Sequence, residues 1–178
     1  MNLLFLCGVT DAGKSSTLRY SVKQLDIPQD VKDRFELSNH NPPKTIVVNR
    51  KKIRIFLCSP QELENEKRSS IEIFTYRIKK ARDSAIDLLV MPLNIDAGYS
   101  NSIDRCLQKI DELNLRDASY FVYLDSNNPE DSYAESTMSQ VQSSGFHTLH
   151  QINRQDGNKE VEFNRRGRIF ASHVKQLL

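Results

Sequence analysis

The amino-acid sequence predicts an α/β fold, in which helices cover both faces of a mostly parallel sheet with one antiparallel edge strand. From residue 87 onwards, short apolar runs alternate with longer segments whose apolar residues recur every three or four positions, as in alternating strands and helices. Residues 2–7 form an uninterrupted apolar run, which is typical of a strand buried on both faces. We therefore expect one domain over residues 1–178, with three layers, six strands and five helices.

Local patterns place these elements along the chain. The first helix is predicted at residues 14–25, and residues 26–43 lack periodicity and read as a long loop. Strand patterns at residues 45–49 and 52–58 are separated by two residues, too few for a helical crossover, so they must form an antiparallel hairpin. The remaining strands are predicted at 87–93, 119–124 and 146–152, and the remaining helices at 69–85, 102–115, 131–144 and 163–178.

Composition and charge argue against a nucleic-acid-binding protein and against a membrane protein. The net charge of +2 is too small to make nucleic acid the expected partner, and the basic clusters at residues 50–54 and 165–168 are interpreted as solvated faces. No apolar run approaches the ~18 residues of a membrane span, and the N-terminal run lacks the basic segment of a signal peptide, so we expect a cytoplasmic protein. The three cysteines have no metal-ligand spacing and are predicted to be reduced and buried.

Residues 8–15, Gly-Val-Thr-Asp-Ala-Gly-Lys-Ser, match the Walker A pattern of a phosphate-binding loop, GxxxxGK[ST]. Gly8 and Gly13 permit backbone conformations that other residues rarely adopt. The backbone amides of the loop, including those of Asp11 and Ala12, are then expected to turn inward and form an anion-binding nest. A buried strand before the motif and a helix after it are the context that this loop requires.

Three side chains at the end of the motif have separate roles in this interpretation. Lys14 is expected to reach the β- and γ-phosphates of a nucleotide. The Ser15 hydroxyl is expected to coordinate Mg²⁺, and Ser16 is placed to contact the α-phosphate. The positive end of the helix that begins near Lys14 favours the same anion.

With this motif followed by a helix, a long loop and an antiparallel hairpin, the chain resembles the Ras-like GTPases in element order. The resemblance covers nearly the whole chain. It implies a P-loop fold with two switch loops, near residues 26–44 and 59–68, and with the first and third strands as neighbours in the sheet. Hydrolysis in that family is in-line attack of water on the γ-phosphate.

The other motifs of that family are altered here. The second switch of the family begins with DxxG, where this chain has Cys58-Ser59-Pro60-Gln61. The Cys58 thiol is not a hard oxygen ligand for Mg²⁺, whereas the Gln61 amide is able to donate to phosphate. Glu62 stands where the family carries its water-orienting glutamine, and a carboxylate there is either a base or a source of repulsion toward the γ-phosphate.

The base-reading NKxD motif is replaced by Asp-Ser-Asn-Asn-Pro at residues 125–129. Asp125 and Asn127 are the candidates for contact with a base edge. For Asp125, a residue that caps the turn after the strand is the favoured alternative. Thr45 and, in second place, Ser38 are the candidate Mg²⁺ ligands from the first switch, although a β-branched residue such as Thr45 is also ordinary in a strand. Asp96, after the fourth strand, is a second candidate for the metal.

Together these observations predict a protein that binds GTP or ATP with Mg²⁺ and hydrolyses it slowly, with Lys14, Gln61 and Glu62 as the catalytic candidates. The switch loops would become more or less ordered as the nucleotide is bound and hydrolysed. A protein partner or regulator that responds to this change is therefore expected. Two other functions stay open. One is a small kinase acting on a nucleotide or metabolite, and the other is a nucleotide-binding scaffold without catalysis.

Overall fold

The computed structural model describes residues 1–36, 44–95, 100–125, 131–155 and 157–178. Their strands form one sheet with the order β2-β3-β4-β1-β5-β6. β2 runs antiparallel to β3, and all the other neighbouring strands are parallel. The strands are β1 (Asn2–Gly8), β2 (Lys44–Val48), β3 (Lys51–Ile55), β4 (Leu88–Asn94), β5 (Ser119–Leu124) and β6 (His147–Ile152).

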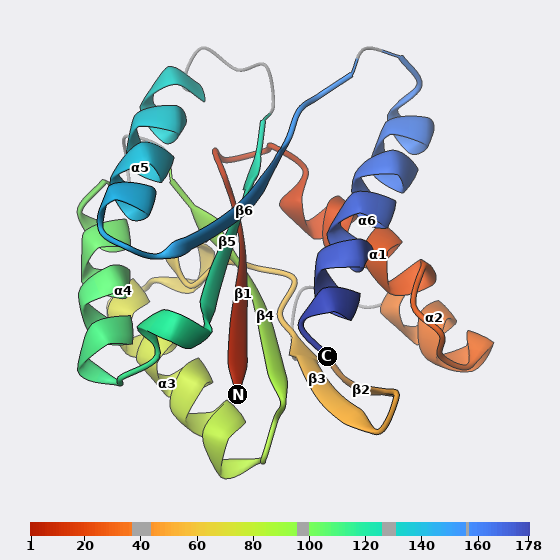
Figure 1. Cartoon of the computed structure of the whole chain (residues 1–178), viewed down its shortest axis with the longest axis horizontal. Coiled ribbons are helices and arrows are strands. Elements are labelled where there is room, and N and C mark those ends of the chain that lie inside the picture. The colour runs from red at the N-terminus through yellow and green to blue at the C-terminus, as the bar shows by residue number, and fades with distance from the viewer. Residues whose placement is uncertain (37–43, 96–99, 126–130, 156) are drawn as a thin grey trace.

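Helices cover both faces of this sheet. Figure 1 shows α3, α4 and α5 on one face and α1 and α6 on the other, with α2 beside α1. The α/β class with a mostly parallel sheet is therefore confirmed. Across the described residues the helices are α1 (Lys14–Lys23), α2 (Gln29–Glu36), α3 (Ser70–Asp83), α4 (Ser100–Glu112), α5 (Asp131–Ser143) and α6 (Lys159–Gln176), with short 3₁₀ turns η1 (Gln61–Leu63) and η3 (Arg116–Ala118).

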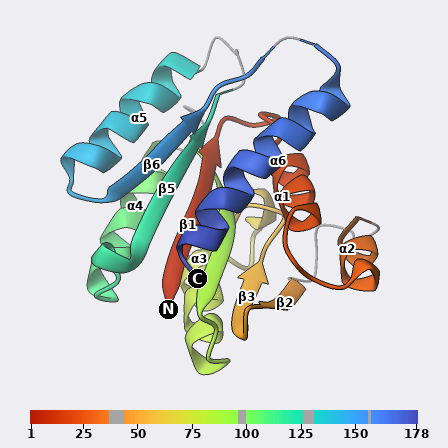
Figure 2. The ribbon, with the colours of Figure 1, turned by 45° about the vertical axis from the view of Figure 1, so that its right-hand side comes forward.

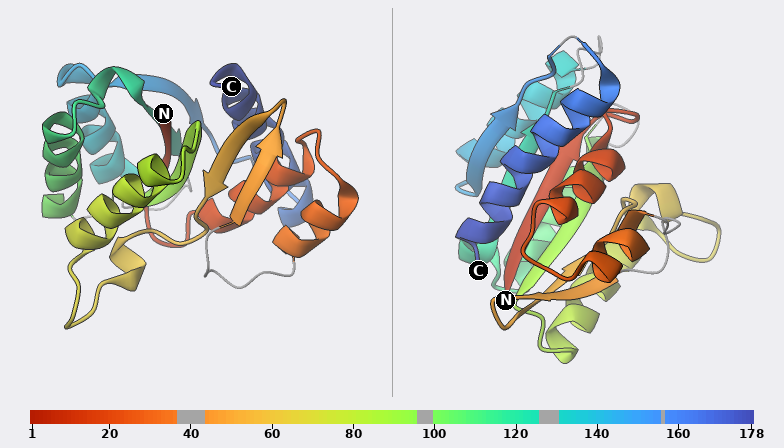
Figure 3. Two further views of the ribbon diagram at one scale, coloured as in Figure 1. Left: turned by 90° about the horizontal axis from the view of Figure 1, so that it is seen from below. Right: turned by 90° about the vertical axis from the view of Figure 1, so that its right-hand side faces the viewer.

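The prediction of five helices is wrong, because α2 lies in the segment predicted to be a loop. Val31 and Phe35 are four residues apart, and Phe35 is buried in the core while Val31 packs against it. A single apolar pair among charged residues gives little periodic signal, so packing rather than sequence pattern stabilises this helix. Figure 3 shows α2 beside the β2–β3 hairpin, where residues of both elements line one cavity.

The hairpin is antiparallel as predicted, but its turn is shifted by one residue. Asn49 and Arg50 form the turn, with φ angles of 49° and 65°. Two successive left-handed residues are typical of the primed turns that match the twist of a two-stranded ribbon, and asparagine favours that conformation. The pairing of Val48 with Lys51 follows from this turn.

The order of the strands corrects the neighbour relation that the resemblance implies. β4 lies between β1 and β3, so the first and third strands are not neighbours. β1 and β4 are both buried along their length. Such strands are apolar on both faces, so their sequences do not fix which strand lies on which side of them. Cys7 on β1 and Cys58 after β3 are therefore separated by a strand, and burial raises the pKa of Cys7 to about 12.

Several predicted details agree with the structure and one does not. The cysteines Cys7, Cys58 and Cys106 are buried as expected, and none forms a disulfide within the described residues. Gly145 ends α5 with a left-handed φ of 82°. The helix predicted at residues 69–85 ends earlier, at Asp83, and Ala85 is exposed beyond its end. No helix in the described residues has the length and apolar character to cross a membrane.

Candidate functional site

The candidate site lies beyond the carboxyl ends of β1 and β4, where the loop of residues 8–15 leads into α1. Gly8 pairs with Asn94 at the ends of the two strands, and the Ile95 N–H donates to the Gly8 carbonyl at 3.3 Å. The helix after β1 covers one face of the sheet and the helix after β4 covers the other (Figure 1). Ligands of open α/β sheets bind at this kind of switch point.

Residues 8–15, which we call the phosphate loop after their Walker A pattern, depend on glycine at two positions. Gly13 has a φ of 86°, and a Cβ atom there would lie 2.6 Å from Cε1 of Phe163. At Gly8 a Cβ atom would lie 2.9 Å from the Leu124 carbonyl oxygen. Asp11 is also left-handed, with a φ of 62°. The loop therefore requires Gly13 for both backbone conformation and space, whereas Gly8 has no left-handed φ and is required for space alone.

Lys14 lies inside the curve of the phosphate loop. Its Nζ atom donates to the carbonyls of Gly8 at 3.0 Å and Val9 at 2.6 Å, and its side chain is buried. α1 begins at Lys14, so the first amides of that helix border the loop. A cation and a helix N-terminus are thus placed together, and both favour an anion.

Ser15 connects the phosphate loop to the segment that follows β3. Its hydroxyl donates to the Leu57 carbonyl at 2.5 Å. The structure therefore brings the loop and the segment at Cys58 together, as the sequence interpretation requires, although β4 separates their strands. Ser16, the next residue of α1, is half-buried.

The two catalytic candidates after Cys58 are held by other groups. The Gln61 side chain is buried and its amide donates to the Asn94 carbonyl at 3.1 Å. The Glu62 carboxylate is exposed and accepts a hydrogen bond from the Ser59 hydroxyl at 3.0 Å. Gln61 therefore joins this segment to the end of β4 beside the phosphate loop, whereas Glu62 is bonded within its own turn.

The remaining metal and base candidates lie apart from Ser15. Thr45 is exposed on the hairpin, where its hydroxyl accepts a hydrogen bond from Nε of Arg54 at 3.1 Å. In the described part of the chain no hydrogen bond joins Thr45 to the phosphate loop. Ser38, Asp96 and residues 126–129 lie outside the described residues. Asp125 is half-buried at the end of β5, where its N–H donates to the Ile152 carbonyl.

Arg166 of α6 links the phosphate loop to the end of β5. Its Nη1 donates to the Ala12 carbonyl at 3.0 Å, and its Nη2 donates to the Asp125 carbonyl at 2.9 Å. Its Nε donates to Glu162 at 2.6 Å, and only 2% of the residue is exposed. The prediction of a solvated basic cluster is therefore wrong for Arg166, and its spacing of four residues from Glu162 is the signal that identifies the pair.

Glu162 is the centre of this polar network. Burial acts to raise its pKa, but hydrogen bonds from Arg165, from the Gln155 N–H at 3.1 Å and from Arg166 outweigh burial and lower the pKa to about 2. Arg165 also donates to the Asn153 carbonyl after β6. α6 thus holds the phosphate loop, the end of β5 and the segment after β6 in one arrangement, and Figure 2 shows α6 beside α1.

A cavity of about 390 Å³ borders the outer side of the phosphate loop. Asp11 and Gly13 line it from the loop, and Arg154, Lys159 and Phe163 line it from the start of α6 and the segment before it. Its walls combine cations with the Phe163 ring and with two carboxylates, those of Asp11 and Glu162.

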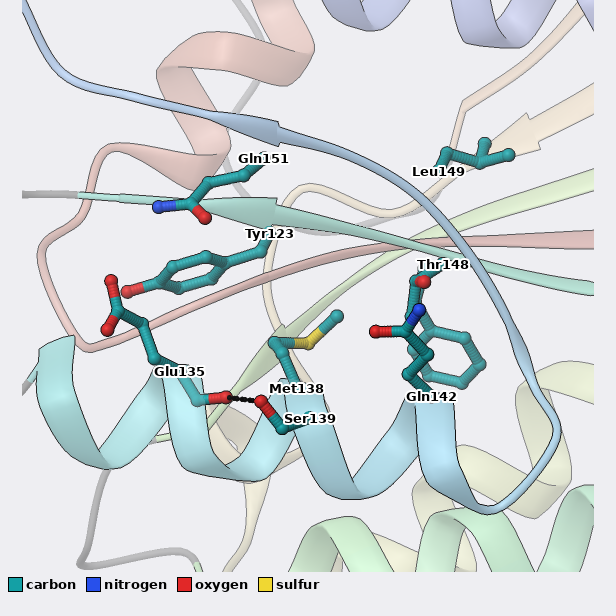
Figure 4. Close-up of a pocket in the computed structure, with 9 residues that line it drawn as sticks. Tyr123, Glu135, Met138, Ser139, Gln142, Thr148, Leu149 and Gln151 are labelled. Atoms are coloured by element: carbon teal, nitrogen blue, oxygen red, sulfur yellow. Dashed lines mark hydrogen bonds between the residues drawn. The ribbon is translucent and has the colours of Figure 1, made fainter.

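A separate cavity of about 410 Å³ lies between α5 and the β5–β6 edge (Figure 4). Tyr123, Glu135 and Gln151 gather at one end, and Gln142 and Thr148 lie at the other. Among the residues that line it, Glu135 is the one charged side chain. This cavity holds none of the side chains singled out from the sequence.

Comparison with models of known protein families gives no match, and comparison with curated proteins gives none either. Within the described residues, no three His, Cys, Asp or Glu side chains cluster as a metal site.

Proposed function

We propose that this chain binds a nucleoside triphosphate with Mg²⁺ through the phosphate loop of a P-loop fold. The observation that carries the proposal is the position of Lys14, whose Nζ atom lies inside the loop within hydrogen-bond distance of two loop carbonyls. This arrangement supports a role in which the cation meets phosphate oxygens enclosed by the same loop. The left-handed Gly13 and the N-terminus of α1 support the same assignment.

The bound phosphates would change the partners of Lys14. Two neutral carbonyl oxygens now accept its hydrogen bonds, and phosphate oxygens would replace them with charged acceptors. Hydrogen bonds between two charged groups are roughly twice as strong as neutral ones. Lys14 therefore favours the triphosphate over the loop carbonyls, and its burial limits competition from water.

The residues near Ser15 fit Mg²⁺ in part. The Ser15 hydroxyl and the Leu57 carbonyl are hard oxygen atoms in contact with one another, and Mg²⁺ takes such ligands together with phosphate oxygens. Burial raises the pKa of the nearby Cys58 thiol, so it stays protonated and is a poor ligand. Ser15 and the phosphates would hold the metal, which when bound neutralises phosphate charge.

Nucleotide binding is better supported than fast turnover. Glu62 is bonded to Ser59, and no hydrogen bond in the described residues joins it to the phosphate loop. Gln61 donates to Asn94 and is buried. Orienting a water molecule would require one of these side chains to exchange its present partner, so we propose slow hydrolysis, at roughly 10⁻⁴ per second, as in an unassisted small GTPase.

Calorimetry with Mg–GTP and Mg–ATP tests the proposal. Lys14→Ala should weaken triphosphate binding on the order of 10- to 100-fold, because a charge-assisted bond of about 1.5–3 kcal/mol is lost. Lys23→Ala, at the other end of α1, is the matched control and should leave the affinity within about twofold. Equal affinities for wild type and Lys14→Ala, or no binding of either nucleotide by wild type, would reject the assignment.

A further inference from the structure

A cationic cavity of about 550 Å³ lies between the end of β3, the η1 segment and α3. It is distinct from the cavity beside the phosphate loop. Four cations and several apolar side chains form its walls, and no carboxylate lines it. The residues that matter for the argument are Arg54, Arg68, Arg77, Lys80, Phe56 and Tyr76.

The two inner cations of this cavity bind neutral partners. Arg77 donates to the Cys58 carbonyl at 2.8 Å and contacts the Cys58 sulfur at 3.7 Å. Arg54 donates to the hydroxyl of Thr45 and, at 3.4 Å, to the Lys80 carbonyl. Across the described residues, none of the four cations forms an ion pair. Glu62 acts on Arg77 electrostatically from outside the cavity wall.

The burial of Arg77 indicates that the cavity is suited to an anion. Only 3% of this residue is exposed, and burial lowers the pKa of its guanidinium from the usual value. A buried charge whose hydrogen-bond acceptors are neutral is costly, and an anion in the cavity would offset that cost beyond the contribution of Glu62. Charged side chains whose pKa is shifted by burial and that line a cleft are candidates for a functional site.

Two aromatic rings also line the cavity. The Tyr76 side chain is 54% exposed, and the Arg68 guanidinium lies 5.6 Å from the centre of its ring. The Arg77 guanidinium lies 4.1 Å from the centre of the Phe56 ring. These rings offer apolar surface beside the cations, so an anion with an organic body gains contacts that a bare inorganic ion does not.

We propose that this cavity binds a small organic anion, a phosphorylated or carboxylated molecule with an aromatic or apolar body. The volume lies within the ~300–1,000 Å³ of small-molecule sites. The anionic group would meet Arg77, Arg68 and Lys80, and the organic part would lie against Tyr76 and Phe56.

The cavity and the phosphate loop contact consecutive residues of one segment. Ser15 donates to the Leu57 carbonyl, and Arg77 donates to the carbonyl of the next residue, Cys58. The two places are therefore close neighbours, and a test has to distinguish an anion in the cavity from an anion in the phosphate loop.

Calorimetric titration with phenyl phosphate and with benzoate tests the proposal, and the two probes separate phosphate from carboxylate as the preferred group. Arg68→Glu and Lys80→Glu reverse exposed charges of the cavity wall and should each weaken the preferred probe at least 10-fold. Lys79→Glu makes the same charge change at the next position of α3, outside the cavity, and should change the affinity less than twofold. Lys14→Ala should also leave it unchanged, and phenol should not bind.

The Arg68, Lys79 and Lys80 side chains are exposed, so their variants should stay folded. Lys14 is buried, so a thermal melt of Lys14→Ala should show that this variant is folded as well. Three results would overturn the proposal. One is no saturable binding of either probe by the wild type. The second is a loss of probe affinity in Lys79→Glu equal to that in Lys80→Glu, which would show that the effect comes from the net charge of the protein and not from the cavity. The third is weakening by Lys14→Ala without weakening by Lys80→Glu, which would place the anion in the phosphate loop.

Discussion

The stability of the fold should depend on the ionisation of Glu162. Hydrogen bonds from Arg165, Gln155 and Arg166 lower its pKa from 4.5 to about 2, against the effect of burial. The difference of about 2.5 pH units corresponds to roughly 3 kcal/mol of folding free energy, at about 1.36 kcal/mol per unit. Because the folded pKa is lower than the unfolded one, this stabilisation is present above pH 4.5 and is lost as the pH falls toward 2.

Replacing the carboxylate with an amide should reproduce that loss at neutral pH. We expect Glu162→Gln to lower the free energy of unfolding by about 3 kcal/mol at pH 7, since it leaves the buried guanidinium of Arg166 without its anionic partner. Glutamine resembles the protonated glutamic acid, so the difference between variant and wild type should shrink below pH 4.5 and disappear near pH 2.

Urea unfolding followed by circular dichroism at several pH values between 7 and 3 measures this difference. Glu160→Gln is the matched control, because Glu160 is exposed in the same first turn of α6 and should change stability by less than about 0.5 kcal/mol. A loss below about 1 kcal/mol for Glu162→Gln at pH 7, or the same loss at pH 7 and pH 3, would refute the electrostatic argument.

Three further substitutions test local packing and backbone conformation by urea unfolding. Gly167→Ala places a Cβ atom 2.6 Å from Cβ of Tyr20 on α1, so it should cost about 1–3 kcal/mol, and unchanged stability would contradict the close approach of the two helices. Arg50→Gly should stabilise the protein by up to about 1 kcal/mol, because φ is 65° there, and a loss would count against the left-handed turn. Ser69→Ala removes the capping box with Glu72 and should cost about 1 kcal/mol, and an unchanged midpoint would show that the cap contributes nothing.

Local signals in the sequence are enough to predict the class of fold and the place of residues 8–15 between a strand and a helix. Apolar runs and three-to-four-residue periodicity identify strands and helices because burial acts on each element through its own repeat. Two residues between adjacent strands leave no alternative to an antiparallel hairpin. The pattern of residues 8–15 places Gly13 and Lys14 correctly at the start of α1, where the left-handed φ of Gly13 accounts for the glycine.

Other features depend on contacts between residues far apart in the sequence. The short helix α2 is stabilised by the packing of Phe35 in the core. The single apolar pair in its sequence is too weak a periodic signal to predict a helix. From the sequence alone Arg166 is one of several arginines expected at the surface. It is buried because its guanidinium donates to the carbonyls of Ala12 in the phosphate loop and Asp125 at the end of β5. The position of β4 between β1 and β3 also depends on contacts between residues far apart in the sequence. Parallel strands that are apolar on both faces look alike in sequence, and their order is set by which edges pair when the helices pack against the sheet.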